Sequence, residues 1–171
     1  AQAESTCQPC EKGKYSDVFG GKSSSSCGAC LSGRYTSETG KTSCTIALAG
    51  SYAADAHGGG VSSGAVKAQP CRAGRFSTTV GASTSSTCER CAAGKFMSLF
   101  GATACDDCMR GRASSAVGAD NVDTCEVCAI GKHSDATGAA ECKKCAKGRY
   151  MDDTGSEKGT CKSCLRGTYA D

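Results

Sequence analysis

Cysteine is the residue type in this chain whose number and spacing point to a chemical role. The chain has 171 residues, 16 of them Cys, and fourteen of these form seven C-x-x-C pairs. Thiols at this spacing are compatible with disulfide cross-links, with tetrahedral zinc sites and with thiol–disulfide exchange. The pairs are Cys7/Cys10, Cys27/Cys30, Cys88/Cys91, Cys105/Cys108, Cys125/Cys128, Cys142/Cys145 and Cys161/Cys164, and Cys44 and Cys71 stand alone.

A repeated unit follows the second Cys of each pair. After two intervening residues comes a Gly, then usually a basic residue and usually an aromatic, as in Gly13-Lys14-Tyr15 and Gly94-Lys95-Phe96. A second Gly lies five residues past the aromatic position, and glycine suits a turn with positive φ. No stretch has the 3.6-residue period of a helix. We therefore predict a small disulfide-rich fold, mostly β or irregular with almost no helix: an elongated solenoid of short β-hairpins.

One unit departs from this pattern. Counting from the lone Cys44 and Cys71 places Ala47 and Ala68 at the two missing Cys positions, around a unit stretched to 20 residues. We expect a flexible loop there, with a lateral contact or a bend of the rod as the functional alternative. The predicted domains are N-terminal repeats at 1–46 with a half-module at 1–7, the atypical repeat lacking its disulfide at 47–68, regular repeats at 69–164 and a C-terminal half-module at 165–171.

The absence of Cys at both Ala47 and Ala68 also discriminates between disulfide schemes. If the second Cys of each pair bonds the first Cys of the next, Ala47 and Ala68 are the two ends of one lost bridge and no thiol inside the array is orphaned. The predicted bridges are Cys10–Cys27, Cys30–Cys44, Cys71–Cys88, Cys91–Cys105, Cys108–Cys125, Cys128–Cys142 and Cys145–Cys161. The rival scheme closes each C-x-x-C on itself and joins Cys44 to Cys71. It is disfavoured because such tiny loops restrain little chain entropy, whereas loops near 15 residues contribute about 3 kcal/mol each.

Zinc is the second reading of the same cysteines. The spacing lies within the range of zinc sites, but each tetrahedral thiolate site needs four ligands. The lone Cys44 and Cys71 would each break a site, and neither His57 nor His133 is placed to repair both. His133 occupies the aromatic position of its repeat, so we expect it to be a packing residue, and His57 to be a loop residue. No cofactor or metal is expected.

Two thiols, Cys7 and Cys164, have no mate in the preferred scheme. Unpaired Cys in a secreted chain suggests intermolecular bonding. Seven residues follow Cys164 and six precede Cys7, so joining two copies head to tail gives the short spacing of 13 seen inside the chain. Such heterologous contacts produce open filaments unless the rotation closes a ring. We therefore expect an intersubunit disulfide in a filament or surface appendage. The alternative is a segment of a longer cysteine-rich receptor ectodomain or stalk that binds a ligand.

The unit C-x-x-G-x-(Tyr/Phe), with its C-x-x-C junctions, resembles the ephrin-receptor-like cysteine-rich repeats of extracellular and protist surface proteins. It is also similar to the first module of tumour necrosis factor receptor repeats. The resemblance covers the chain from Cys7 to Tyr169, with Ala47, Ala68, Ala113 and His133 as departures. It implies a disulfide-bonded scaffold, the same pairing, and an extracellular setting, but it implies no particular ligand because function is grafted onto folds site by site.

Composition narrows the function classes further. Only 17 residues are Leu, Ile, Val or Phe, too few for a conventional core, so cross-links must replace burial. The net charge is +3 without a basic block, which argues against nucleic acid, and no apolar run is long enough to span a membrane. The missing initiator Met fits a secreted chain with its signal removed, or a segment of a longer one.

No set of residues typical of an enzyme active site is present, so we expect a protein that is not an enzyme and lies outside the cell or at its surface. Glycans are possible partners, with O-glycosylation candidates at Ser23, Ser24, Ser25, Ser26, Ser83, Thr84, Ser85, Ser86 and Thr87.

Overall fold

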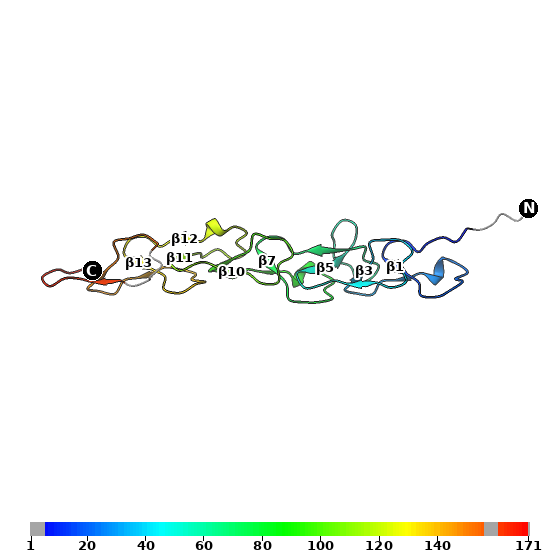
Figure 1. Cartoon of the computed structure of the whole chain (residues 1–171), viewed down its shortest axis with the longest axis horizontal. Coiled ribbons are helices and arrows are strands. Elements are labelled where there is room, and N and C mark those ends of the chain that lie inside the picture. Colours follow the sequence, from blue (N-terminus) through cyan, green and yellow to red (C-terminus); the bar gives the residue numbers. More distant parts are fainter. Residues whose placement is uncertain (1–5, 156–160, 171) are drawn as a thin grey trace, which may run out of the picture. The chain divides into compact units, whose positions relative to one another are not determined.

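The fold is a series of two-stranded antiparallel sheets, seen in a computed structural model that describes residues 6–155 and 161–170 (Figure 1). The prediction of small disulfide-rich hairpins is confirmed, and the described residues contain no α-helix. The paired strands are β1 (Lys14–Tyr15) with β2 (Gly28–Ala29), β3 (Arg34–Tyr35) with β4 (Thr45–Ile46), β5 (Ser51–Ala54) with β6 (Lys67–Pro70), β7 (Arg75–Phe76) with β8 (Glu89–Arg90), β9 (Lys95–Phe96) with β10 (Asp106–Asp107), β11 (Arg112–Ala113) with β12 (Glu126–Val127), β13 (Lys132–His133) with β14 (Lys143–Lys144), and β15 (Arg149–Tyr150) with β16 (Lys162–Ser163).

Each hairpin belongs to one repeat, which we call a module and number 1 to 8 along the chain. A module runs from a second-Cys position to the next first-Cys position. The eight modules span 10–27, 30–44, 47–68, 71–88, 91–105, 108–125, 128–142 and 145–161. Of the half-modules expected at the two ends, residues 1–5 and 171 lie outside the described residues.

Long and short modules differ by a turn of 3₁₀ helix. The bridged modules 1, 4 and 6 have a sequence separation of 17 between their cysteines, against 14 in modules 2, 5 and 7. Short polar side chains hold these turns, which are η1 (Ser24–Ser26), η2 (Ser85–Thr87) and η3 (Val122–Thr124). In η2 the Thr87 hydroxyl donates to the Thr84 carbonyl at 2.9 Å. The O-glycosylation candidates lie in and beside η1 and η2, where most of them are exposed, and their modification stays a prediction.

The chain divides into two compact units, each made of residues that lie close together in space. One comprises the residues up to Cys71 together with Ser77–Cys88, and the other comprises Arg72–Phe76 together with the residues from Glu89 onward. The atypical module lies within the first unit, and the repeat boundaries expected at 47 and 69 stay a prediction.

The buried residues are small or sulfur-containing. They include eight cysteines, several alanines and two methionines, with Tyr52 as the one large aromatic. In modules 2 to 8 the residue after the aromatic position is buried: Thr36, Ala53, Ser77, Met97, Ser114, Ser134 and Met151. Since successive strand residues face opposite sides, the aromatic faces the other side of its hairpin, where Tyr52 is buried as well.

Three backbone hydrogen bonds join successive modules. Between modules 1 and 2, the Gly13 N–H donates to the Thr36 carbonyl, the Ser16 N–H to the Lys41 carbonyl and the Gly40 N–H to the Cys10 carbonyl, at 2.8–3.0 Å. All three bonds recur between modules 3 and 4, 5 and 6, and 6 and 7. Among the described residues, two of them join modules 2 and 3 and modules 7 and 8, and one joins modules 4 and 5. They satisfy backbone groups that two-residue strands leave unpaired, so hairpins too short to persist alone stabilise one another.

The expectation of a flexible loop at 47–68 is wrong. β5 and β6 form the longest hairpin, with four residue pairs against two in each other module. Its inserted segment packs on module 2, where the Gly64 N–H donates to the Cys30 carbonyl at 2.8 Å. Ala47 is fully buried with Ala53 and Ala65, and Tyr35 and Val61 pack against them. Longer pairing and this apolar cluster stand in for the absent bridge. The lateral contact and the bend stay predictions.

Candidate functional site

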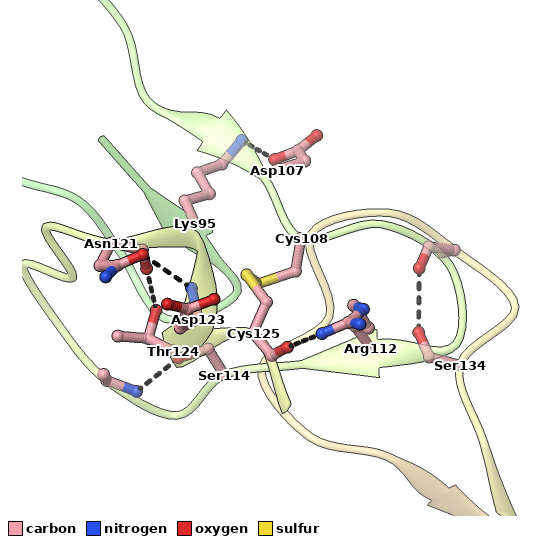
Figure 2. Close-up of a disulfide and its surroundings, with 12 residues drawn as sticks. Lys95, Asp107, Cys108, Arg112, Ser114, Asn121, Asp123, Thr124, Cys125 and Ser134 are labelled. Carbon is pink, nitrogen blue, oxygen red and sulfur yellow. Dashed lines mark hydrogen bonds and ion pairs between the residues drawn. A yellow bond between two sulfur atoms is a disulfide. The ribbon is translucent and has the colours of Figure 1, made fainter. Parts of the chain in front are cut away.

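The chemistry-bearing groups of the described chain are seven disulfides and two free thiols. The seven bridges join the pairs predicted from the cysteines missing at Ala47 and Ala68. Their Cα atoms are 5.5–5.8 Å apart, within the ordinary range for disulfides. No C-x-x-C pair closes on itself. Each bridge instead ties the start of a module to its end, as Figure 2 shows for Cys108–Cys125.

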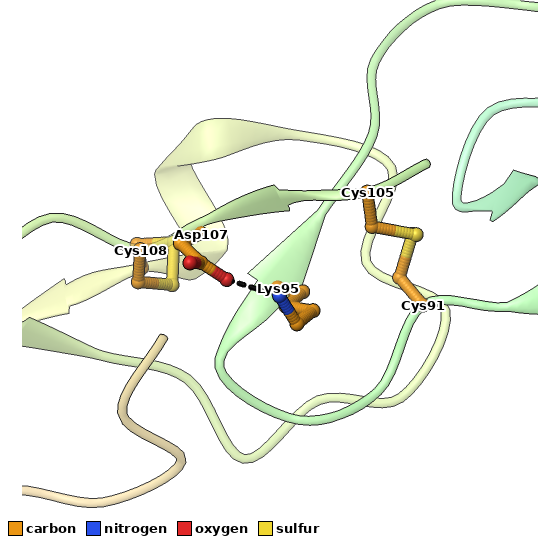
Figure 3. Close-up of polar contacts among 6 residues, drawn as sticks. Cys91, Lys95, Cys105, Asp107 and Cys108 are labelled. Carbon is orange, nitrogen blue, oxygen red and sulfur yellow. Dashed lines mark hydrogen bonds and ion pairs between the residues drawn. A yellow bond between two sulfur atoms is a disulfide. The ribbon is translucent and has the colours of Figure 1, made fainter. Parts of the chain in front are cut away.

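Backbone and side-chain bonds hold each bridge in place. The N–H of the second Cys donates back to the first Gly of the preceding module, as Cys108 does to the Gly94 carbonyl at 2.8 Å. In modules 2, 5 and 6 the basic residue after that Gly reaches across its own hairpin. The Arg34 and Arg112 guanidinium groups donate to the Cys44 and Cys125 carbonyls at 3.2 and 2.8 Å, and Lys95 forms an ion pair with Asp107 between two bridges (Figure 3). These three basic residues therefore brace their hairpins.

Cys7 and Cys164 are the free cysteines. Cys164 is partly exposed and makes the bond typical of a second Cys, from its N–H to the Gly148 carbonyl at 2.9 Å. The Gly148 N–H in turn donates to the Ala170 carbonyl at 3.1 Å, the same bond that joins successive modules elsewhere. Residues 164–170 therefore occupy the first half of a further module. Cys7 is exposed and lies at a groove that Pro9, Cys10 and Lys14 also line.

Comparison with known protein families agrees with this geometry. Residues 78–125 match the family model described as tyrosine-protein kinase ephrin type A/B receptor-like. Residues 78–125 therefore form an ephrin receptor-like cysteine-rich repeat. The match runs from within module 4 to the end of module 6, and modules 1, 2 and 7 have the same bridge spacings of 17 and 14. No curated protein matches the chain. Among the described residues, none of the helical segments has the length and apolar character that crossing a membrane requires.

One histidine lies against the disulfide of module 8. His133 Nδ1 is 3.3 Å from Cys161 Sγ, and these two atoms and Cys145 Sγ all lie within 4.8 Å of one another. Because the two sulfurs are bonded to each other, neither is the thiolate that a zinc site needs. His133 lies where an aromatic packs on the bridge of the next module, as Tyr52 does on Cys71 and Cys88. His57 is exposed in a turn, where its N–H donates to Asp55 Oδ1 at 2.9 Å.

Exposed carboxylates of the repeats are held in their ionised form. The Lys162 ammonium donates to both Asp152 oxygens, at 2.7 and 2.8 Å, and this hydrogen bond lowers the pKa of Asp152. Lys41 likewise lowers the pKa of Glu38. The pKa of Asp135 is lowered first by a hydrogen bond to its own backbone N–H and then by Lys143. The backbone N–H of Gly59 lowers the pKa of Asp55.

The Asp152–Lys162 pair makes a pH prediction for module 8. A carboxyl whose pKa is lower in the folded state stabilises the fold above its unfolded pKa, and this contribution is lost as pH falls through the folded pKa. We expect NMR titration to place the Asp152 midpoint below the ordinary Asp value, and Lys162→Met to raise it toward that value, with the backbone hydrogen bond of Asp152 still lowering the pKa. An unchanged midpoint in Lys162→Met would contradict the assignment.

Proposed function

We propose that this protein is an extracellular structural protein whose copies join head to tail through a disulfide between Cys164 of one copy and Cys7 of the next. The observation that carries the proposal is that residues 164–170 already form the first half of a module, docked on module 8 by the Gly148 to Ala170 bond. In modules 1, 2 and 4 to 8, a cysteine in the position of Cys164 bonds the cysteine that ends its module. The residues from Cys7 to Cys10 have the spacing of such a module end.

The repeat fixes the register of the composite hairpin. In module 1, Lys14 pairs with Ala29 and Tyr15 with Gly28. Transferring this register pairs Thr168 with Pro9 and Tyr169 with Gln8 of the neighbouring copy. Proline at that position is compatible with the hairpin, because module 3 pairs Ser51 with Pro70. The neighbouring N–H of Cys71 supplies the ladder bond there, to the Gly50 carbonyl at 2.8 Å. The sequence has two prolines, and both occupy this position.

The second candidate is a ligand-binding ectodomain or stalk, and the receptor-like family match is the observation that favours it. In that case Cys7 and Cys164 bond further modules of the same polypeptide. Both candidates share the disulfide density of secreted proteins, and the proposal assigns the chain no catalytic role.

Electrophoresis without reductant tests the linkage. After incubation in an oxidising glutathione buffer, which takes up the two electrons and two protons released, we expect bands at multiples of 17.2 kDa. Cys7→Ser and Cys164→Ser should each remain monomeric alone. Mixed together, they should stop at a dimer, since one retains Cys164 and the other retains Cys7.

Three outcomes would count against this arrangement. A single monomer band for the unsubstituted chain would exclude covalent linkage and favour the ectodomain. Dimers formed by Cys7→Ser alone would mean that Cys164 bonds Cys164, a tail-to-tail contact that cannot continue. Ladders that persist in both variants would place the linkage at another cysteine.

A further inference from the structure

The bridge of module 8 differs from the other six in its exposure. Each of the others has at least one buried cysteine, and these buried members are Cys10, Cys30, Cys71, Cys88, Cys91, Cys108, Cys125 and Cys128. Cys145 and Cys161 are both only partly buried. Because thiol–disulfide exchange needs in-line approach of a thiolate to a sulfur, access is one of the factors that set its rate.

The same bridge has a nitrogen base beside it. His133 Nδ1 approaches Cys161 Sγ at 3.3 Å, which is within hydrogen-bonding distance for sulfur. Tyr52 occupies the same repeat position in module 3, where its ring packs in one cluster with Cys71 and Cys88 of the next bridge. A tyrosine ring has no nitrogen to offer these sulfurs. Across the hairpin, His133 pairs with Lys143, whose ammonium lies 3.4 Å from Asp135.

From these two observations we propose that Cys145–Cys161 is a thiol–disulfide exchange site, with a small thiol such as glutathione as co-substrate and His133 as the group that assists the leaving sulfur. The incoming thiolate attacks Cys145 Sγ and forms a mixed disulfide. The Cys145–Cys161 bond breaks, and its electron pair goes to Cys161 Sγ. The imidazolium of His133 gives its Nδ1 proton to that sulfur and becomes neutral. A second thiolate then attacks the mixed disulfide, which frees Cys145 and yields the oxidised small thiol.

Opening this bridge changes the segment that bears Cys164. β16 (Lys162–Ser163) lies between Cys161 and Cys164. Once the bridge is open, the contacts that remain within the described residues include the pairing with β15, the Asp152–Lys162 ion pair, the Lys162 ammonium over the Tyr150 ring and the Cys164 N–H bond to the Gly148 carbonyl. Exchange at Cys145–Cys161 therefore loosens the strand that carries the free thiol. This consequence rests on the proposed head-to-tail linkage, whereas the exchange itself does not.

Partial reduction of the full chain with glutathione tests the proposal. Samples are quenched by alkylation over time, and peptide mass mapping without further reduction gives the opening of each bridge and the sulfur that carries glutathione. We expect Cys145–Cys161 to open first, with glutathione on Cys145 and the alkylating group on Cys161. In His133→Phe we expect opening at this bridge to slow by about tenfold, because the leaving thiolate loses its hydrogen-bond donor.

His133→Phe is a matched control for exposure, since Phe76 and Phe96 occupy the same repeat position and His133→Tyr provides a second ring of this kind. Equal opening rates in the unsubstituted chain and both variants would mean that exposure alone sets the rate, and would overturn the role of His133. Opening of Cys145–Cys161 no faster than Cys91–Cys105 would overturn the site. Glutathione found on Cys161 in place of Cys145 would overturn the proposed direction of attack. If electrophoresis shows no disulfide between Cys7 and Cys164 but the bridge-opening rates are as expected, the exchange site is supported and the head-to-tail linkage is not.

Discussion

Replacing Gly94 with alanine is expected to destabilise the second unit by about 3–5 kcal/mol, near the upper end for single substitutions. Gly94 has φ of +82°, and a Cβ there would lie 2.0 Å from the carbonyl oxygen of Gly138, two modules further along the chain. Because the contact is with backbone, no side-chain rotation relieves it. The measurement is urea unfolding of the full chain with its disulfides intact.

Gly131→Ala is the matched control for this substitution. Gly131 occupies the same repeat position with φ of +78°, but no described atom lies within 4 Å of the place its Cβ would take. Gly131→Ala is therefore expected to lose about 1–2 kcal/mol of stability, the cost of a positive φ for an L-residue, with no steric clash added. Equal losses in the two variants would contradict the view that close approach of backbones between modules limits the choice of residue.

Removing the Cys71–Cys88 bridge by the double substitution Cys71→Ala/Cys88→Ala is expected to cost about 4–5 kcal/mol. Loss of a cross-link at a sequence separation of 17 accounts for about 3 kcal/mol by the chain-entropy argument. The remainder comes from packing, since both cysteines are buried in one apolar cluster with Tyr52, Ala54 and Ala82. Urea unfolding gives the total, and amide exchange of Tyr52 and Ala54 localises it.

The control for that bridge is Cys145→Ala/Cys161→Ala. Its loop is of similar length, with a sequence separation of 16, but its sulfurs are only partly buried. We expect it to cost about 3 kcal/mol, the cross-link contribution alone. If both double variants lose the same stability, packing on the sulfurs contributes nothing. If neither loses any, the hydrogen bonds between modules suffice without cross-links.

The disulfide pairing was readable from the sequence because it is a property of the repeat. Cysteine is lost at both Ala47 and Ala68, a bridge that spans a module explains the two losses at once, and the rival pairing is disfavoured by its tiny loops. The turn glycines and the absence of α-helix were readable for the same reason, since positive φ and hairpin length are local requirements.

Other features depend on residues far apart in the chain and left no local signal. The approach of Gly94 to Gly138 and the bonds between modules arise only when hairpins stack. The lost bridge of the atypical module suggested looseness, whereas Tyr35 of module 2 and Val61 of the inserted segment pack against the cluster of Ala47, Ala53 and Ala65. His133 was recognised as a packing residue, but its distance from Cys161 Sγ could not be read from a separation of 28 residues.

The missing bridge of module 3 also determines how the polypeptide responds to mechanical tension. In a bridged stretch, the load passes from Cys10 through sulfur to Cys27, across two residues to Cys30, and through the next sulfur pair, so unravelling those hairpins adds no length. Between Cys44 and Cys71 the load must instead follow 26 residues of backbone. Fully drawn out, that segment reaches roughly 90 Å. Module 3 is therefore the extensible element in an otherwise inextensible covalent tether running from Cys10 to Cys161.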